Sequence, residues 1–205
     1  CGYKGHVIKQ YFDNYRSNNF DIEVDLGLGE TRRLSPPKED WKVTLIDTGE
    51  NTQTGGRLKR VAHLLPSNES FLFTYGDGLT NVDIEALTSF HKKMKRLATV
   101  TAVQLPGRFG SLSIENDRVS EFVEKRRGDQ GYINGGFFIL EPEAINSIKD
   151  DNTAWEGEPM AVLARTGELA AFKHEGFWQP MDTLRDKVEL SKLWKTQQAP
   201  WRLWL

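Results

Sequence analysis

The chain alternates between segments with apolar residues every three or four positions and shorter, mostly apolar runs. Val7, Ile8, Tyr11 and Phe12 form one stripe along a helix, whereas the aromatic run at 70–75 is typical of a buried strand. The pattern predicts helices over 5–12, 57–65, 83–96, 142–148, 158–165 and 183–195, and strands over 41–47, 70–75, 98–103, 111–114, 119–124, 133–140 and 169–174. Strands that alternate with helices indicate an α/β protein.

Two stretches interrupt this alternation. Residues 17–42 are polar, rich in Gly, Asp and Arg, and contain Pro36 and Pro37, which predicts an irregular insertion with no more than one short strand. Residues 178–182 contain Pro180 and predict a loop before the last helix.

Composition narrows the class of protein. A length of 205 residues favours one domain, expected over 1–205. The chain has 27 Lys and Arg against 29 Asp and Glu, a net charge of −2, which argues against a general nucleic-acid binder. No apolar run approaches the length of a membrane span, so no membrane association is expected. A single cysteine, Cys1, and no secretory leader in this sequence predict a cytoplasmic protein.

Two aspartates follow predicted structural elements at places suited to a ligand. Asp77 lies between two glycines after the strand at 70–75, and Asp182 lies between the loop and the last helix. Ligands bind at the carboxyl ends of strands in open α/β sheets, and two carboxylates plus phosphate oxygens suit Mg²⁺. The local sequence alone favours simpler roles, an Asp-Gly turn for Asp77 and a helix N-cap for Asp182.

Three other segments could contact a ligand. Thr54, Gly55, Gly56 and Arg57 open a helix that also carries Lys59 and Arg60, which suits an anion or is an ordinary loop-to-helix junction. The others are Glu124-Lys125, either a sugar-phosphate contact or an exposed charge pair, and Asn134-Gly135-Gly136, whose glycines inside a strand indicate close backbone approach.

Taken together, these segments resemble the glucose-1-phosphate cytidylyltransferases, a family of sugar-nucleotide pyrophosphorylases. The resemblance covers essentially the whole chain. It is carried by Cys1-Gly2-Tyr3-Lys4-Gly5, Thr54-Gly55-Gly56-Arg57-Leu58-Lys59-Arg60, Phe73-Thr74-Tyr75-Gly76-Asp77-Gly78, Pro106-Gly107-Arg108-Phe109-Gly110, Glu124-Lys125, Ile133-Asn134-Gly135-Gly136-Phe137-Phe138 and Phe177-Trp178-Gln179-Pro180-Met181-Asp182-Thr183-Leu184-Arg185-Asp186. It implies a Rossmann-like mixed sheet flanked by helices, the nucleotide-diphospho-sugar transferase fold.

The resemblance also implies an activity and its residues. The family transfers a cytidylyl group from CTP to α-D-glucose 1-phosphate, giving CDP-glucose for bacterial surface polysaccharide, and a homo-oligomer is expected. Roles carried over by the resemblance are Mg²⁺ binding by Asp77 and Asp182; nucleotide binding by Thr54, Gly55, Gly56 and Arg57; sugar contacts by Gly107, Gly110, Glu124, Asn134 and Gly135; and phosphate binding and catalysis by Lys125. Alternatives are a transferase for another base or sugar, and a non-catalytic homologue.

The chain departs from the family pattern at two places. The family begins with a strand and a Gly-x-Gly-Thr-Arg loop that would lie before Cys1, so we expect this sequence to lack about fifty upstream residues, including the first strand and the Gly-rich loop. Because the first strand of such a sheet is central, residues 1–205 alone are expected to be unstable and inactive. Arg126 also replaces the proline usual after Glu-Lys.

Overall fold

The computed structural model describes residues 1–35, 39–104, 111–115, 118–123 and 131–204. Four residues expected at the sugar site, Gly107, Gly110, Glu124 and Lys125, lie outside these ranges. The chain divides into two compact units, and each is described here by itself.

The first unit consists of Cys1–Leu64 and Ile148–Glu158. Its elements are α1 (Gly5–Asp13), α2 (Tyr15–Asn19), β1 (Ile22–Asp25), β2 (Glu30–Arg33), α3 (Thr54–Val61) and the 3₁₀ helix η1 (Ala62–Leu64). The helix predicted at 5–12 is confirmed as α1, and the one predicted at 57–65 is confirmed as α3 followed by η1.

Two predictions in this unit are wrong. The insertion contains two strands, because β1 pairs with β2 antiparallel from Ile22↔Arg33 to Asp25↔Glu30. The Asp25 carboxylate accepts hydrogen bonds from the backbone N–H groups of Gly27 and Leu28, both at 2.9 Å, which closes the turn. Residues 41–47 alternate in polarity as predicted but form no strand, since they have no ladder with any other described residue.

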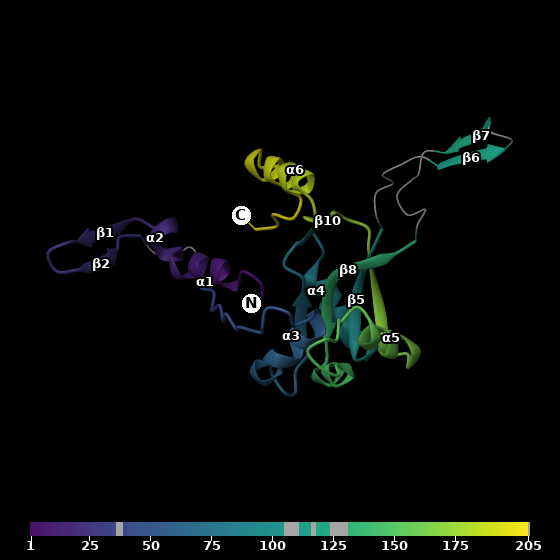
Figure 1. Cartoon of the computed structure of the whole chain (residues 1–205), viewed down its shortest axis with the longest axis horizontal. Helices are drawn as coiled ribbons and strands as arrows, with labels where there is room; N and C mark the ends of the chain where they lie inside the picture. The colour runs from purple at the N-terminus through teal and green to yellow at the C-terminus, as the bar shows by residue number, and fades with distance from the viewer. Residues whose placement is uncertain (36–38, 105–110, 116–117, 124–130, 205) are drawn as a thin grey trace. The chain divides into compact units, whose positions relative to one another are not determined.

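The second unit, Leu65–Ser147 and Pro159–Leu205, is built on a mixed four-stranded sheet. Figure 1 shows this sheet, whose strand order is β3 (Phe71–Thr74), β8 (Ile133–Leu140), β5 (Ala98–Val103) and β9 (Leu169–His174). β8 is antiparallel to both neighbours, and β5 is parallel to β9. The strands predicted at 98–103, 133–140 and 169–174 are confirmed with the same bounds.

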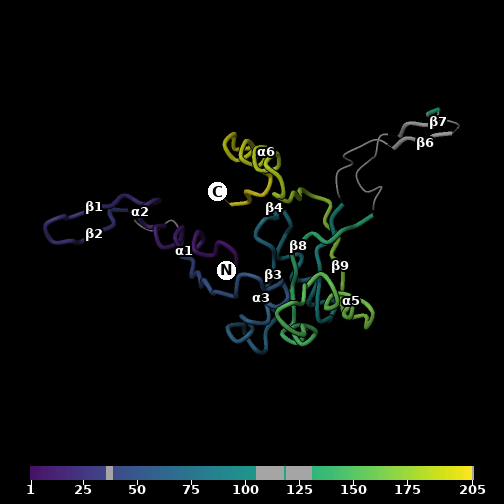
Figure 2. Tube along the Cα trace, in the orientation of Figure 1, coloured from purple at the N-terminus to yellow at the C-terminus, as the bar shows by residue number. Residues whose placement is uncertain are grey.

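The remaining elements of this unit can be followed along the chain in Figure 2. They are β4 (Gly78–Thr80), α4 (Ile84–Met94), β6 (Ser111–Glu115), β7 (Arg118–Val123), the 3₁₀ helix η2 (Pro142–Ser147), α5 (Glu158–Arg165), β10 (Trp178–Pro180) and α6 (Leu184–Lys195). The helix predicted at 158–165 is confirmed, but the one predicted at 142–148 is a 3₁₀ helix. The prediction of a loop over 178–182 is wrong for its first three residues, which form β10 and pair antiparallel with β4.

The core of the second unit lies on and around the central strands. Phe138, Leu140, Val103 and Leu87 are all at most 1% exposed. Strand β5 is buried at all six positions, which explains why its sequence is an unbroken apolar and threonine run.

Among the described residues, no helix is long and apolar enough to cross a membrane.

Candidate functional site

Asp77 and Asp182 reach the same end of the β4–β10 pair. The ladder runs from Trp178↔Thr80 to Pro180↔Gly78, and the next backbone contact is the Met181 N–H donating to the Asp77 carbonyl at 2.9 Å. Asp182 is the next residue after Met181, so the register brings the backbones of two aspartates from distant parts of the sequence close together. Both residues are exposed.

The N-cap explanation for Asp182 is wrong, because Thr183 caps α6. The Thr183 hydroxyl accepts a hydrogen bond from the Asp186 N–H, and the Asp186 carboxylate accepts one in return from the Thr183 N–H at 2.9 Å, a complete capping box. Asp186 is 5% exposed and also accepts from the Gln179 side chain at 3.0 Å, which fastens α6 to β10. Asp182 is therefore held by its neighbours without using its own carboxylate.

The donor set at this end of the ladder fits a magnesium site completed by phosphate. Within the described part of the chain, neither Asp77 nor Asp182 has a side-chain hydrogen bond or ion pair. No cluster of three or more His, Cys, Asp or Glu side chains suitable for a metal is found among the described residues. Mg²⁺ commonly takes one or two carboxylates and completes its shell with substrate phosphates and water, which matches two free carboxylates.

The start of α3 packs tightly against the segment 151–155 of its own unit. A β-carbon at Gly55 would lie 2.7 Å from the Thr153 carbonyl oxygen, and one at Gly56 would lie 2.6 Å from the Asp151 Cα and carbonyl oxygen. The Gly56 N–H also donates to the Thr153 carbonyl at 3.1 Å. Both glycines are buried, so they are required by chain packing whether or not a nucleotide also contacts them.

Thr54 is tied to the same segment through its hydroxyl. It donates to the Glu156 carboxylate at 2.7 Å and accepts from the Trp155 N–H at 2.8 Å. The hydroxyl therefore already has a donor and an acceptor within this unit.

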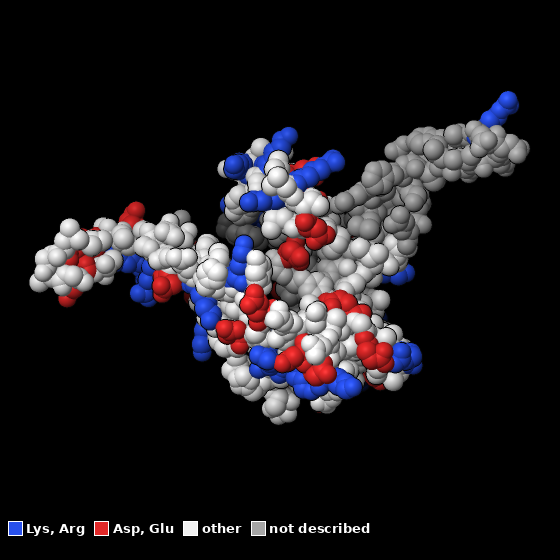
Figure 3. All heavy atoms as spheres, viewed as in Figure 1, with Lys and Arg blue, Asp and Glu red and all other residues white. Residues whose placement is uncertain are grey.

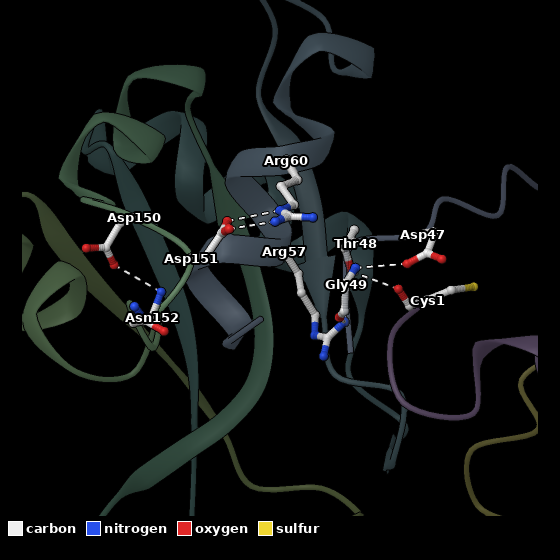
Figure 4. Close-up of polar contacts among 9 residues, drawn as sticks. All are labelled: Cys1, Asp47, Thr48, Gly49, Arg57, Arg60, Asp150, Asp151 and Asn152. Atoms are coloured by element: carbon white, nitrogen blue, oxygen red, sulfur yellow. Dashed lines mark hydrogen bonds and ion pairs between the residues drawn. The ribbon is translucent and has the colours of Figure 1, made fainter. Parts of the chain in front are cut away.

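The three cations of α3 are engaged by the chain itself, as Figure 4 shows for Arg57 and Arg60. The Arg57 guanidinium donates to the Thr48 hydroxyl at 2.8 Å, to the Gly49 carbonyl at 2.9 Å and to the Glu50 carbonyl at 3.1 Å. The Lys59 ammonium donates to the Ile148 and Lys149 carbonyls at 2.8 and 3.0 Å.

Arg60 forms a two-point contact with Asp151, at 3.0 Å from Nε and 2.6 Å from Nη2. Hydrogen bonding to Arg60 lowers the pKa of the Asp151 carboxyl and raises the pKa of Arg60 itself. Nearby, the Gly49 N–H hydrogen bond lowers the pKa of Asp47. The basic residues of α3 therefore bind loop 48–50 and segment 148–151.

Asn134 and Gly135 lie at an irregularity in β8. The pairing with β5 passes from Val100↔Phe138 to Ala102↔Asn134, which skips Gly135, Gly136 and Phe137 on β8 and one residue on β5. The close approach expected at these glycines is confirmed: a β-carbon at Gly135 would lie 2.8 Å from the Thr101 carbonyl oxygen, and one at Gly136 (φ +80°) would lie 2.5 Å from the Tyr75 ring. The Asn134 Oδ1 accepts from the Gly136 N–H at 2.9 Å, and its Nδ2 donates to the Tyr75 hydroxyl at 3.3 Å.

Trp178 belongs to a segment that carries the family resemblance, but the sequence assigned it no role. Its indole N–H donates to the Gly135 carbonyl at 2.7 Å, which links β10 to the irregular part of β8. Only the presence of a tryptophan in a predicted loop could have drawn attention to it, because the partner is 43 residues away in the sequence.

The charge distribution on the face in Figure 3 is mixed. Lys and Arg side chains gather over α6, and acidic and basic residues are interspersed over much of the remaining surface drawn. This view shows no continuous basic surface of the kind that follows a nucleic-acid backbone.

Comparison with known proteins identifies the class. The nucleotidyl transferase family matches residues 23–184. In a solved structure of HddC from Yersinia pseudotuberculosis, the fold matches with a TM-score of 0.55 at 23% identity, covering 76% of this chain and 68% of that one. The chain belongs to the nucleotidyl transferase family, and the mixed α/β fold predicted from the sequence is confirmed.

Closer relatives define the branch. The chain is 52% identical over 204 residues to glucose-1-phosphate cytidylyltransferase from Salmonella typhi, covering 100% of this chain and 79% of the relative. It is 41% identical to the probable glucose-1-phosphate cytidylyltransferase of Bacillus subtilis (strain 168), covering 99% of this chain and 79% of that protein. Within the nucleotidyl transferases, the chain belongs to the glucose-1-phosphate cytidylyltransferase family.

Proposed function

We propose that this protein transfers the cytidylyl group of CTP to α-D-glucose 1-phosphate. A phosphate oxygen of the sugar phosphate forms a bond to the α-phosphorus of CTP, the bond from that phosphorus to the β-phosphate oxygen breaks, and CDP-glucose and pyrophosphate are formed. The proposal rests on the 52% identity over the whole chain, together with two exposed carboxylates at one end of the β4–β10 pair.

Asp77 and Asp182 would hold the magnesium ion. When bound, Mg²⁺ neutralises negative charge on the phosphates of the reacting nucleotide. The chain's contribution is placement: the Met181–Asp77 backbone contact and the Thr183–Asp186 capping box fix the backbone on either side of Asp182. Both carboxylates can approach a ligand without first breaking a hydrogen bond to another described residue.

Asn134 and Gly135 would contact the sugar. One N–H of the Asn134 amide is directed to Tyr75, which leaves its second N–H for a glucose hydroxyl. Glu124 would accept hydrogen bonds from glucose hydroxyls and Lys125 would bind the sugar phosphate, roles that the family resemblance assigns to residues outside the described ranges. Gly107 and Gly110 would form part of the same pocket.

The start of α3 would contact the cytosine through its backbone. The first amide N–H groups of a helix have no partner within the helix, so those of Thr54 and Gly55 are suited to the base. The Gly56 N–H is bonded to Thr153 and the Arg57 side chain to loop 48–50, so we assign these two residues a structural role in holding the start of α3. The family resemblance instead implied that both contact the nucleotide directly.

Pyrophosphate release by the complete protein tests the proposed reaction. CTP, UTP, GTP and dTTP would each be paired with glucose 1-phosphate and with mannose 1-phosphate. We expect CTP with glucose 1-phosphate to exceed every other pair by at least about 100-fold in kcat/KM, since a site that hydrogen-bonds its substrate rejects poor matches strongly. A faster alternative pair would reassign the substrates, and no turnover with any pair would indicate a non-catalytic homologue.

We also propose a cytoplasmic homo-oligomer. Helix α6 leaves Leu184 and Val188 exposed, at 76% and 60%, on a surface that a second copy could cover. Light scattering of the complete protein should give a mass that is a multiple of the monomer, and Leu184→Lys should lower it if α6 is part of the interface.

A further inference from the structure

Strand β10 is too short to hold itself in place. It has three residues and pairs only with the three residues of β4 in the described sheets. An isolated two-stranded pair is marginally stable at best, so side chains must fix its position. This matters because β10 leads directly to Asp182.

The residue before β10 is held at both of its backbone groups. The Phe177 N–H donates to the Asn81 side-chain oxygen at 2.7 Å. The Phe177 carbonyl accepts from the Thr80 hydroxyl at 2.8 Å and lies 3.1 Å from the His174 Nε2. The same His174 Nε2 lies 3.2 Å from the Thr80 hydroxyl, so both side chains lie beside the Phe177 carbonyl.

Trp178 then links this small ladder to the main sheet. Its indole N–H donates to the Gly135 carbonyl at 2.7 Å, and the same nitrogen would lie 3.9 Å from a β-carbon at Gly78. Gly135 is buried. It follows Asn134 and is one of the β8 residues without a paired residue in β5. One indole ring thus lies between β4, just after Asp77, and the segment proposed to contact the sugar.

We propose that Trp178 is a positioning residue that fixes the magnesium carboxylates relative to the sugar-binding segment of β8, with Asn81 supporting it. This inference rests on the proposed function. Trp178 acts through the Gly135 carbonyl and the β10 backbone, and its ring takes no chemical part in the reaction. Loss of the indole N–H leaves β10 free to shift against β8, and small misplacements of reacting groups are costly to the rate.

The test is Trp178→Phe in the complete protein, with Trp194→Phe as the matched control. Phenylalanine keeps an aromatic ring but removes the N–H, and Trp194 is a 48% exposed residue of α6. We expect kcat to fall by about tenfold or more, and KM for glucose 1-phosphate and half-saturation by Mg²⁺ to rise, while KM for CTP stays within about twofold. The control should leave all four values unchanged.

Hydrogen exchange at the Met181 amide gives a readout independent of turnover. This amide donates to the Asp77 carbonyl, and its exchange should accelerate in Trp178→Phe but not in Trp194→Phe. Faster exchange with wild-type kinetics would overturn the positioning role. A fall in kcat alone, with unchanged KM values and Mg²⁺ dependence, would indicate only a smaller folded fraction and would also overturn it.

A second pair of variants covers the case in which Trp178→Phe does not fold. Asn81→Ala removes the acceptor of the Phe177 N–H, whereas Asn81→Asp retains an oxygen there. We expect the alanine variant to show the same kinetic split and the aspartate variant to restore most of the activity; equal activity in the two would contradict the proposal. Every variant is compared with wild type using whichever nucleotide and sugar phosphate wild type turns over, so a wrong substrate assignment is recognised separately.

Discussion

The start of α3 and the end of the β4–β10 pair were both predicted from the sequence to bind a ligand. The structure gives their side chains different surroundings. At α3, the Arg57 side chain is bonded to loop 48–50, and the space beside Gly55 and Gly56 is filled by segment 151–155. At β4–β10, Asp77 and Asp182 stay exposed. A residue whose side chain is already engaged is first a structural residue, and a charged residue that the fold leaves free is the better candidate for chemistry.

The largest expected effect is at the free carboxylates. Asp77→Asn or Asp182→Asn in the complete protein should lower kcat by about 100- to 1,000-fold, because the proposed metal loses a charged ligand. The melting temperature should stay near the wild-type value, since neither carboxylate bonds to another described residue. Asp83→Asn is the control, because Asp83 caps α4 and asparagine caps about equally well. Near-normal turnover of both variants at saturating Mg²⁺ would remove the metal assignment.

Gly56→Ala should act on stability before it acts on nucleotide binding. The added carbon would lie 2.6 Å from the Asp151 backbone, which predicts a loss of about 1–3 kcal/mol in the free energy of unfolding. Gly157→Ala is the matched control, since its nearest contact would be at 3.4 Å. Denaturant unfolding measures both. An unchanged stability with a selective loss of CTP affinity would instead favour the base-contact role.

Arg57→Lys separates the structural and ligand roles of that side chain. Lysine keeps the charge but cannot reproduce the contacts with Thr48, Gly49 and Glu50, so stability should fall by about 1–2 kcal/mol. KM for CTP should remain close to wild type. Arg185→Lys, on an exposed i,i+4 pair with Glu189, should be nearly neutral. A raised KM for CTP with unchanged stability would contradict the structural role of Arg57.

The smallest effect concerns the pH dependence of stability at Asp151. Arg60 lowers the pKa of this carboxyl below the ordinary value of 3.8, so the folded state binds its proton less readily than the unfolded state. The Asp151–Arg60 pair therefore adds to the free energy of unfolding above about pH 4, and this contribution is lost as the pH falls through the lowered pKa. Asp151→Asn should weaken the decline in stability between about pH 5 and pH 3. An identical decline in wild type and variant would show that the pair adds nothing measurable.

The sequence predicted the elements whose pattern is set by local periodicity and burial. The strands β5, β8 and β9 and the helix α5 were found with their bounds because each is a buried run or a clear helical stripe between breaking residues. Residues 41–47 have the alternation of a strand, but no strand in the described part of the chain pairs with them, and alternation alone does not specify a pairing strand. Strand β10 was missed because three residues carry no periodicity, and its partner β4 is about a hundred residues away.

The same limit applies to the candidate site. Asp77 and Asp182 could be proposed from residue type and placement, but only the β4–β10 register brings them together. The capping role expected for Asp182 belongs to Thr183, one residue later, because its hydroxyl and the Asp186 carboxylate form a reciprocal pair. The tight packing of Gly55 and Gly56 depends on a segment about a hundred residues distant, which local sequence does not reveal.

Metal binding tests the central claim most directly, because it asks whether the free carboxylates are the ligands. Mn²⁺ would be titrated into the complete protein at saturating CDP-glucose, with free ion followed by electron paramagnetic resonance. Wild type should bind one ion per chain, and the double variant Asp77→Asn, Asp182→Asn should bind it at least about tenfold more weakly with an unchanged melting temperature. Equal Mn²⁺ affinity in the two proteins would contradict the assignment of this site.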